Sequence, residues 1–365
     1  MMLKSSWMTN QQKQMEKDRL KSIFAQFKTE NNTTKDRNSR VLVIDGLNMF
    51  IRSFMASPLM NEHGTHIGGT VGFVKSLFSV IRHFRPTRCV LIFDGKDGGA
   101  RRRKRYPEYK AGRRNRDRLN RVVEDGSLVE GESFTDQFNN MEYLINTMPL
   151  TMMSIDFIEA DDVIGYIAKD YYKANDFGEL FIVSADKDFI QLVDTNISVY
   201  SPIKRILYNP TTVVKEFGLS AYNYLTFRVF DGDDSDNIVG VKGIGLKTFI
   251  KFFPEVTERN IDPLEIIEIA KLRIIEGSKR KTYQTVVDSE EQILLNWYLM
   301  DLSNADIPSN KKFNIKDIMD SDVYQLDKLK LKKLIYAHRL NDHFKHFDSL
   351  IYSSLTQLNL YAEAE

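Results

Sequence analysis

The sequence predicts an α/β fold in which helices cover both faces of a parallel sheet, followed by a mostly helical C-terminal region. Continuous apolar segments alternate with helical segments up to about residue 212, which is the pattern of parallel strands buried on both faces. Each of the predicted strands also runs into an aspartate. From about Val213 the pattern is mostly helical, and no internal repeat is present.

The predicted strands share one form, a short apolar segment with an acid at its carboxyl end. The first covers residues 41–44, in "RVLVIDGLNMF", and ends at Asp45. The second, in "CVLIFDG", ends at Asp94, and the third, in "ELFIVSADKDF", ends at Asp186. Because sites in open α/β sheets lie at the carboxyl ends of the strands, we expect these three aspartates to converge.

Helices are predicted between these strands. Residues 70–84 have helical periodicity, and "FIEADDVIGYIAKDYY" predicts a helix after Ile158 with acids in its first turn, where the helix dipole favours them. One amphipathic helix is expected near residues 15–27. The predicted organisation is a polar tail at residues 1–40, a core at residues 41–212 and a helical region at residues 213–365.

The composition excludes several classes of protein. With 365 residues, 42% hydrophobic and 28% charged, the chain can bury a sizeable core. The single cysteine, Cys89, excludes a disulfide scaffold and a cysteine zinc site. No apolar run approaches the roughly 20 residues of a membrane span, and the N-terminus has no signal-peptide core. We expect a monomeric, cytoplasmic protein without membrane contact.

Carboxylates gather at the predicted strand ends and close to them. Hard divalent cations such as Mg²⁺ and Mn²⁺ take oxygen ligands, and two such ions about 4 Å apart can promote hydrolysis of a phosphodiester. No histidine stands in these motifs, which argues against zinc. Any one of these acids is more simply a helix cap or a solvated loop residue, but their joint placement predicts a metal site. The candidate ligands are Asp45, Asp94, Glu159, Asp161, Asp162, Asp186, Asp188, Asp233 and Asp236.

The net charge of +1 conceals a strongly basic stretch. Residues 100–118 carry ten basic and two acidic side chains, with Tyr106 and Tyr109 among them. Lysine and arginine neutralise phosphates, and aromatic rings stack on unpaired bases. Taken alone, such a run is more often a solvated loop or a localisation signal. Its place directly after the strand that ends at Asp94 favours a polyanion partner.

A glycine-rich segment follows the last acids. In "GDDSDNIVGVKGIGLKT", Gly240, Gly243 and Gly245 alternate with Lys242 and Lys247. Glycines let the backbone approach phosphates, and amides at a helix N-terminus bind anions. These contacts carry no base readout, so we expect recognition of nucleic-acid structure and not of sequence.

Taken in order, six motifs resemble the 5′ nuclease family. They are "VIDGLNMF", "IFDG", "YPEYKAGR", "IEADDVIG", "SADKDF" and "GDDSDNIVGVKGIGLKT". That family includes flap endonucleases, the 5′ nuclease domains of bacterial repair polymerases, and phage 5′–3′ exonucleases with ribonuclease H activity. The resemblance covers about residues 41–254, and the free-standing form is most similar to the phage or small bacterial members. The expected location is the cytoplasm, which is the host cytoplasm if a phage encodes the protein.

The resemblance implies a PIN-like nuclease core and a two-metal phosphodiesterase that uses Mg²⁺, with Mn²⁺ as a substitute. Asp45, Asp94, Glu159 and Asp161 match the family's ligands of the first metal. The set around the second metal is matched by Asp161, Asp186, Asp188 and Asp236. Asp162 and Asp233 match acids that lie outside these ligands. Asp231 and Asp234 match no ligand position. The basic stretch resembles the family's helical arch, here about residues 97–135, in which Lys110 and Arg113 match the pair that faces the scissile phosphate.

The resemblance also implies DNA contacts and partners. The implied DNA-binding residues are Arg52, Arg102, Tyr109, Arg228, Gly240, Lys242, Gly243, Gly245 and Lys247. The resemblance implies that Gly240, Gly243 and Gly245 form the hairpin of a helix–turn–helix element, where a monovalent cation is a further expectation. The implied substrates are branched or nicked duplex DNA and RNA–DNA hybrids with 5′ ends or flaps, in replication or repair. "QLNLY", from Gln357 to Tyr361, is similar to sliding-clamp-binding peptides, although a fraying helix end is the simpler interpretation.

Two alternatives are kept open. A PIN-type endoribonuclease shares the acidic sheet edge but normally lacks the arch and the glycine hairpin. A catalytically silent DNA binder should have lost carboxylates, yet every expected position is filled.

Overall fold

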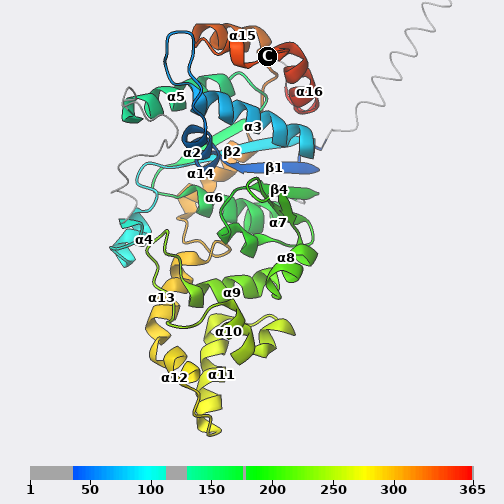
Figure 1. Ribbon diagram of the computed structural model, residues 1–365. Helices are drawn as coiled ribbons and strands as arrows, with labels where there is room; N and C mark the ends of the chain where they lie inside the picture. The colour runs from blue at the N-terminus through cyan, green and yellow to red at the C-terminus, as the bar shows by residue number, and fades with distance from the viewer. Residues whose placement is uncertain (1–35, 112–129, 176–177, 364–365) are drawn as a thin grey trace, which may run out of the picture. The chain divides into compact units, whose positions relative to one another are not determined.

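The computed structural model describes residues 36–111, 130–175 and 178–363 (Figure 1). A six-stranded sheet with the order β3-β2-β1-β4-β5-β6 forms the centre of this part of the chain, and its strands are parallel except for β6. The strands are β1 Arg40–Asp45, β2 Arg88–Asp94, β3 Thr151–Ile155, β4 Glu179–Val183, β5 Ile197–Ser201 and β6 Ile206–Tyr208. The expected parallel sheet is therefore confirmed.

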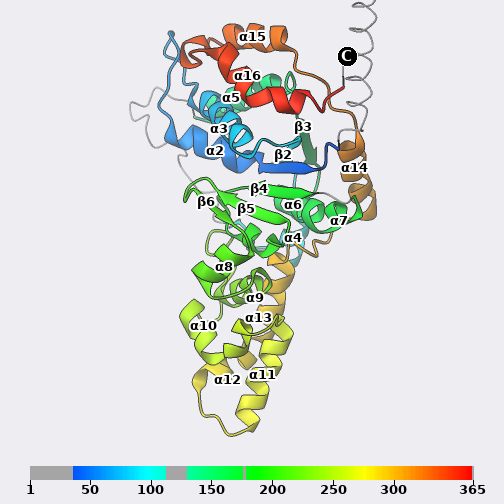
Figure 2. The ribbon, with the colours of Figure 1, turned by 90° about the vertical axis from the view of Figure 1, so that its right-hand side faces the viewer.

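The alternation of side chains along β1 explains why both faces need a cover. Leu42 and Ile44 belong to one buried cluster, and Val41 and Val43 belong to another. Neighbouring side chains of a strand point to opposite faces, so a wholly apolar strand is stable only between two layers. Figure 2 shows α2, α3, α5, α15 and α16 on one side of the sheet and α6 and α8 to α13 on the other.

The structure confirms both helices that the sequence predicts between the strands. The helix expected at residues 70–84 is α3, Gly68–Phe84. The helix expected after Ile158 begins with α6, Ala160–Tyr166, and continues through a π-helical turn, η2, Ile167–Tyr171, and α7, Tyr172–Ala174. The other helices of this part are α2 Gly46–Ala56, α4 Ala100–Arg105, α5 Glu130–Ile145 and η3 Asp188–Leu192.

The region after residue 208 is helical, as expected. Its helices are α8 Pro210–Phe217, α9 Ala221–Asp231, α10 Leu246–Phe252, η4 Pro254–Thr257, α11 Pro263–Ile275, α12 Lys281–Asp288, α13 Glu290–Met300, α14 Ser309–Asp320, α15 Lys328–Ala337, η5 Asn341–His343 and α16 Phe347–Asn359. The last helices return to the core, because α14 packs against β3, α15 against α5 and α16 against α3. The predicted division at residue 213 thus does not separate these helices from the sheet.

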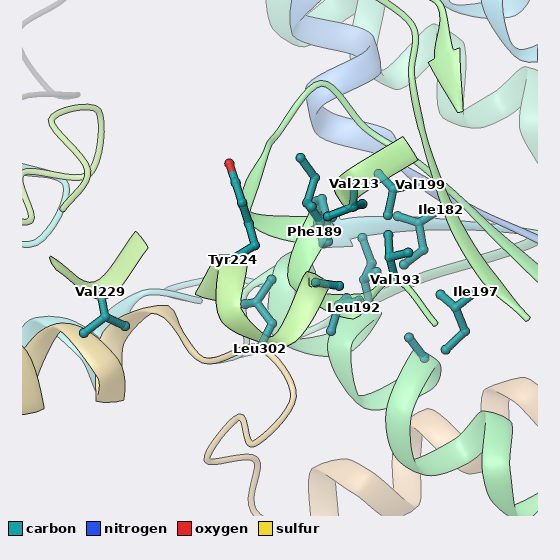
Figure 3. Close-up of a cluster of buried hydrophobic side chains, with 14 of the residues drawn as sticks. Ile182, Phe189, Leu192, Val193, Ile197, Val199, Val213, Tyr224, Val229 and Leu302 are labelled. Carbon is teal, nitrogen blue, oxygen red and sulfur yellow. The ribbon is translucent and has the colours of Figure 1, made fainter. Parts of the chain in front are cut away.

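A continuous apolar cluster joins the sheet to α8 and α9 (Figure 3). Ile182 of β4, Val199 of β5 and Phe189 of η3 belong to it, together with Val213 of α8 and Tyr224 of α9. Because protein cores are densely packed, this cluster holds α9 against η3, the short helix that follows β4. The consequence for function is that the acids after α9 are fixed relative to the acids after β4.

Some sequence expectations differ from the structure. The strands β3, β5 and β6 were not predicted, and the third predicted strand ends at Val183 and not at Asp186. The predicted helix at residues 15–27 lies outside the described residues. No helix of residues 36–111, 130–175 or 178–363 has the length and apolar character needed to cross a membrane.

Residues 357–363 are part of the fold and not a free peptide. Gln357 to Asn359 form the last turn of α16, and Leu358 is buried in the core. The backbone of Glu363 pairs with Val323 and Gln325, which fixes the segment after the helix. The clamp-binding prediction for this segment therefore requires that Leu358 leave the core.

Candidate active site

The carboxyl ends of the central strands present three acids held by local hydrogen bonds. Asp45 ends β1 and caps α2, accepting a bond from the Asn48 amide at 3.0 Å and another from the Ser184 hydroxyl at 3.0 Å. Asp94 ends β2 and accepts from the Ala160 amide at 2.8 Å, which fixes the start of α6 beside it. Asp186 follows β4 and accepts from the Asp188 amide at 2.8 Å.

These acids lie close enough to one another to affect their ionisation. Burial, with repulsion from Asp94 and Asp186, raises the pKa of Asp45 to about 7. Burial and the charges of Asp186, Asp45 and Asp94 raise the pKa of Asp161 well above its ordinary value. Burial also raises the pKa of Asp186, together with the neighbouring charge of Asp236. Burial is the largest cause of these shifts, and the contributions of neighbouring carboxylates show that the structure brings the predicted acids together.

Lys110 lies among these acids. Its ammonium donates to Glu159 Oε1 and lies 3.8 Å from Asp236 Oδ2, and its backbone amide donates to the Asp236 carbonyl at 2.9 Å. Burial by itself lowers the pKa of Lys110, but the surrounding anions, including Glu159 and Asp161, raise it, so the side chain stays charged. Lys110 has a φ of +56°, a left-handed conformation that costs energy for a residue with a side chain.

The buried carboxylate of Glu159 is held by two cations. Arg102 donates to Oε2 at 2.6 Å while Lys110 binds Oε1, and Tyr109 donates from its hydroxyl at 3.2 Å. Burial tends to raise the pKa of Glu159, but Lys110 and Arg102 lower it below its ordinary value. The Arg102 guanidinium also makes a two-point contact with Asp162, at 2.7 and 2.6 Å.

Arg228 of α9 neutralises the second group of acids. It donates to Asp188 at 3.2 Å, to Asp233 at 2.7 Å and to the Gly232 carbonyl at 2.9 Å. Burial and repulsion from Asp186 raise the pKa of Asp188 to about 7. For Asp233, by contrast, burial would raise the pKa, but the bonds from Ser235 and the charge of Arg228 lower it.

The segment after α9 is a tight hairpin. Asp233 and Ile238 exchange two backbone hydrogen bonds of 2.8 Å, and Val241 donates to the Phe230 carbonyl at 2.7 Å. The amide of buried Asn296, on α13, donates to the Val229 and Val239 carbonyls at 2.9 Å each. This bonding fixes Asp233 and Asp236 relative to α9 and so relative to the sheet edge.

Replacing Gly240 should disrupt this hairpin. A Cβ at Gly240 would lie 2.0 Å from the Asp231 carbonyl oxygen, a backbone atom that cannot move aside cheaply. We expect Gly240→Ala to destabilise the protein by about 1–3 kcal/mol or more, measured as a lower Tm. Gly245→Ala is the matched control, because Gly245 has a φ of −93° and open space around its Cα. Equal melting temperatures for the two variants would contradict this expectation.

The predicted DNA-contact residues separate into two groups. Lys242 and Lys247 are exposed beside the hairpin, and Gly243 has a φ of +82° with open space around it, so this surface is accessible. Arg52 lines a groove of about 490 Å³ with Arg205, and none of the described residues that line it is acidic. These positions suit contact with phosphates.

The second group faces inward in this structure. Tyr109 is 4% exposed and Arg102 is 8% exposed, and both contact Glu159. Arg228 is engaged by Asp188 and Asp233. The sequence predicts that these three side chains contact DNA, but here they bind the protein's own carboxylates, so contact with DNA would require those interactions to break. Arg113 and residues 112–129 of the predicted arch lie outside the described residues.

The donor set suits a hard divalent cation. Asp45, Asp161 and Asp186 offer carboxylate oxygens, which are the donors that such a cation prefers, and a bound cation would relieve the repulsion between their charges. Over the described residues, no group of three or more His, Cys, Asp and Glu side chains is arranged as a ready-made metal site. Basic side chains hold part of the set instead, as the contacts of Lys110 and Arg228 show.

One residue of the site was not predicted. Ser184 lies between β4 and Asp186, bonds Asp45 through its hydroxyl and accepts from the Asp186 amide at 3.1 Å. It thereby ties two strand-end acids together. Its place in the "SADKDF" motif, directly after a strand, is the signal by which it could have been found.

Comparison with known proteins agrees with this architecture. Residues 40–218 match the model of the 5′-3′ exonuclease N-terminal resolvase-like domain. The chain is 32% identical over 218 residues to thermostable DNA polymerase I of Thermus thermophilus, covering 59% of this chain and 24% of that protein. It is 29% identical over 264 residues to DNA polymerase I of Bacillus caldotenax, covering 70% of this chain and 27% of that protein. The match thus spans about a quarter of the length of these relatives.

Solved structures share the fold. Bacteriophage T5 5′-exonuclease with bound zinc superposes with a TM-score of 0.61 at 21% identity, over 77% of this chain and 98% of that one. Bacteriophage T5 flap endonuclease in a complex with DNA and metal ions gives a TM-score of 0.58 at 21% identity, over 81% and 98%. The match of residues 40–218 therefore places this part of the chain in the 5′-3′ exonuclease family, and the solved structures share its fold.

Proposed function

We propose that this chain is a metal-dependent, structure-specific 5′ nuclease that cleaves phosphodiesters at 5′ ends and flaps during DNA replication or repair. The observation that carries the proposal is the cluster of acids at the strand ends and at the start of α6, in which burial and neighbouring charges raise the pKa values of Asp45 and Asp161, with Lys110 beside them. Folding alone does not favour several carboxylates side by side, whereas a site for divalent cations requires them. The DNA-bound and metal-bound relatives from bacteriophage T5 support it.

The acids divide into two neighbouring sets that suit two Mg²⁺ ions, with Mn²⁺ as a substitute. Asp45, Asp94, Glu159 and Asp161 would hold the first ion; Asp161, Asp186, Asp188 and Asp236 would hold the second; Asp162 and Asp233 would orient ligands from outside. Bound divalent ions would acidify an attacking water and offset the charge of the leaving oxygen. The Lys110 ammonium, together with Arg113, would stabilise the charge that develops on the phosphate.

The substrate would be a duplex with a 5′ end or flap, including RNA–DNA hybrids such as primers. The exposed Lys242 and Lys247 and the open turn at Gly243 suit the backbone of a duplex, with a monovalent cation as a further ligand of the hairpin. The protein would act as a monomer. Clamp binding through residues 357–361 would require α16 to unwind at its end, because Leu358 is buried.

The proposal is tested with a 5′-labelled flap duplex in Mg²⁺, with and without EDTA. We expect cuts near the junction that EDTA abolishes and that Asp186→Ala reduces by at least about 100-fold. Asp234→Ala is the matched control, because Asp234 is exposed and matches no ligand position. Cleavage of single-stranded RNA alone would favour a PIN-type endoribonuclease. Tight flap binding without cleavage in either metal would favour a silent DNA binder.

A further inference from the structure

The buried guanidinium of Arg102 donates hydrogen bonds from all three of its nitrogens. Its Nε donates to the Leu299 carbonyl at 2.9 Å, and its two terminal nitrogens donate to Glu159 and Asp162 at 2.6–2.7 Å. The guanidinium carbon also lies 5.8 Å from the centre of the Tyr109 ring. Arg102 therefore connects α4, the start of α6 and the end of α13 at one buried point.

The orientation of Glu159 depends on this contact. Arg102 binds Oε2 of the carboxylate, which leaves Oε1 to the ammonium of Lys110, on the side of Asp236. Without Arg102, both oxygens could turn to Lys110, and Asp162 would lose its described ion-pair partner. The fork of an arginine is needed here, because an ammonium cannot bind two carboxylates and a carbonyl in one plane.

We infer that Arg102 is a positioning residue that fixes Glu159 and Asp162 for divalent-cation binding and does not contact DNA in its described position. The inference rests on the proposed function, because it assigns a role within the metal site of that function. Groups that orient metal ligands typically contribute 10–100-fold to metal affinity. Arg102 is only 8% exposed, so a direct phosphate contact would first have to break four hydrogen bonds.

The test is a calorimetric titration of the full chain with Mn²⁺ in the absence of nucleic acid. We expect Arg102→Met to weaken Mn²⁺ binding by about 10–100-fold. Arg102→Lys, which keeps the buried charge and so protects folding, should give an intermediate loss because the fork is absent. Arg101→Met is the matched control: Arg101 is the neighbouring arginine of α4, and it pairs with the exposed Asp306.

Different outcomes separate the possible roles of Arg102. Wild-type Mn²⁺ affinity in both folded Arg102 variants, with a lower Tm alone, would show that Arg102 only stabilises the fold and would overturn the inference. A raised KM for flap DNA with a smaller salt dependence and unchanged Mn²⁺ affinity would show a DNA contact and would also overturn it. At saturating Mn²⁺ we expect kcat to fall and KM to stay constant.

The same titration distinguishes this inference from the proposed function. If wild-type protein binds Mn²⁺ and the Arg102 variants bind it weakly, the positioning role stands even where no nucleic acid is cleaved. If wild-type protein binds Mn²⁺ and cleaves flaps but the variants match it, only the positioning role fails. If wild-type protein binds no Mn²⁺, both fail.

Discussion

Lys110→Ala should lower the rate of flap cleavage by about 100–1000-fold at saturating Mg²⁺, the range found when one donor to a developing anion is removed. The Lys110 ammonium is the cation that lies among Glu159, Asp161 and Asp236 in the described site. Its charge is secure at neutral pH, because the surrounding anions raise its pKa. Single-turnover cleavage measures the chemical step without interference from product release.

Lys104→Ala is the matched control for this variant. Lys104 is also a lysine of the basic stretch, but it is exposed on α4 and lies outside the acidic site. We expect its removal to weaken substrate binding slightly at low salt, with the cleavage rate at saturation unchanged. If the two variants lose the same amount of activity, and added substrate restores both, Lys110 acts through general phosphate attraction and not at the reacting phosphate.

Lys110→Ala should also change the metal-free site, in a direction that can be checked independently. Glu159 would keep only Arg102 as a cation, so its lowered pKa should move back towards the ordinary value. The fold should survive, since Arg102 still binds one oxygen of the carboxylate. A near-wild-type Tm with a large loss of cleavage would therefore separate the chemical role of Lys110 from a structural one.

The sheet edge could be predicted from the sequence, because its signal is local and repeated. An apolar run followed by an acid marks both a buried parallel strand and its functional end, and Asp45 and Asp94 lie at such ends. The rule places Asp186 correctly near this edge even though β4 ends earlier, at Val183. A strand end moved by three residues does not change which edge the side chain reaches.

The partners of the basic side chains could not be predicted in the same way. Arg102 and Lys104 are two residues apart in one basic run, yet one is buried against carboxylates and the other is exposed. Which face of α4 points inward depends on α6 and α13, which contribute Glu159 and the Leu299 carbonyl from distant parts of the chain. A count of charges along the sequence contains no such information, and neither does a motif that aligns Arg102 with DNA contacts.

Asp45 and Asp188, two of the proposed metal ligands, should make the metal-free protein less stable above pH 7 than below it. In the folded state Asp45 and Asp188 have a pKa of about 7, whereas an unfolded aspartate titrates near ~3.9. The folded state thus binds more protons between about pH 4 and pH 7, so stability rises as the pH falls through 7. Glu159 has the opposite shift, but it stays ionised in both states between pH 6 and pH 8 and does not contribute there.

We therefore expect metal-free protein to melt at a higher temperature at pH 6 than at pH 8. Each group with a folded pKa of about 7 contributes about 1.4 kcal/mol over this interval. At an unfolding entropy of about 2.1 cal/mol/K per residue, 1 kcal/mol corresponds to about 1–2 °C in a chain of 365 residues. Asp45→Asn should raise the Tm at pH 8 and reduce the difference between the two pH values. Asp234→Asn, at an exposed acid of the same region, should change neither.

Mg²⁺ should offset this pH dependence. Cation binding requires ionised carboxylates, so protons compete with the metal at pH 6 and much less at pH 8. Saturating Mg²⁺ at about 100 times its Kd would add about 2.7 kcal/mol to stability, and we expect most of that gain at pH 8. Two results would contradict this expectation: equal Mg²⁺ stabilisation at both pH values, or a metal-free Tm that is higher at pH 8. Either would mean that the pKa values of Asp45 and Asp188 are not raised in the folded state. If both expectations hold, the burial and repulsion of these carboxylates cause the lower stability at pH 8, and the same charges favour the binding of cations there.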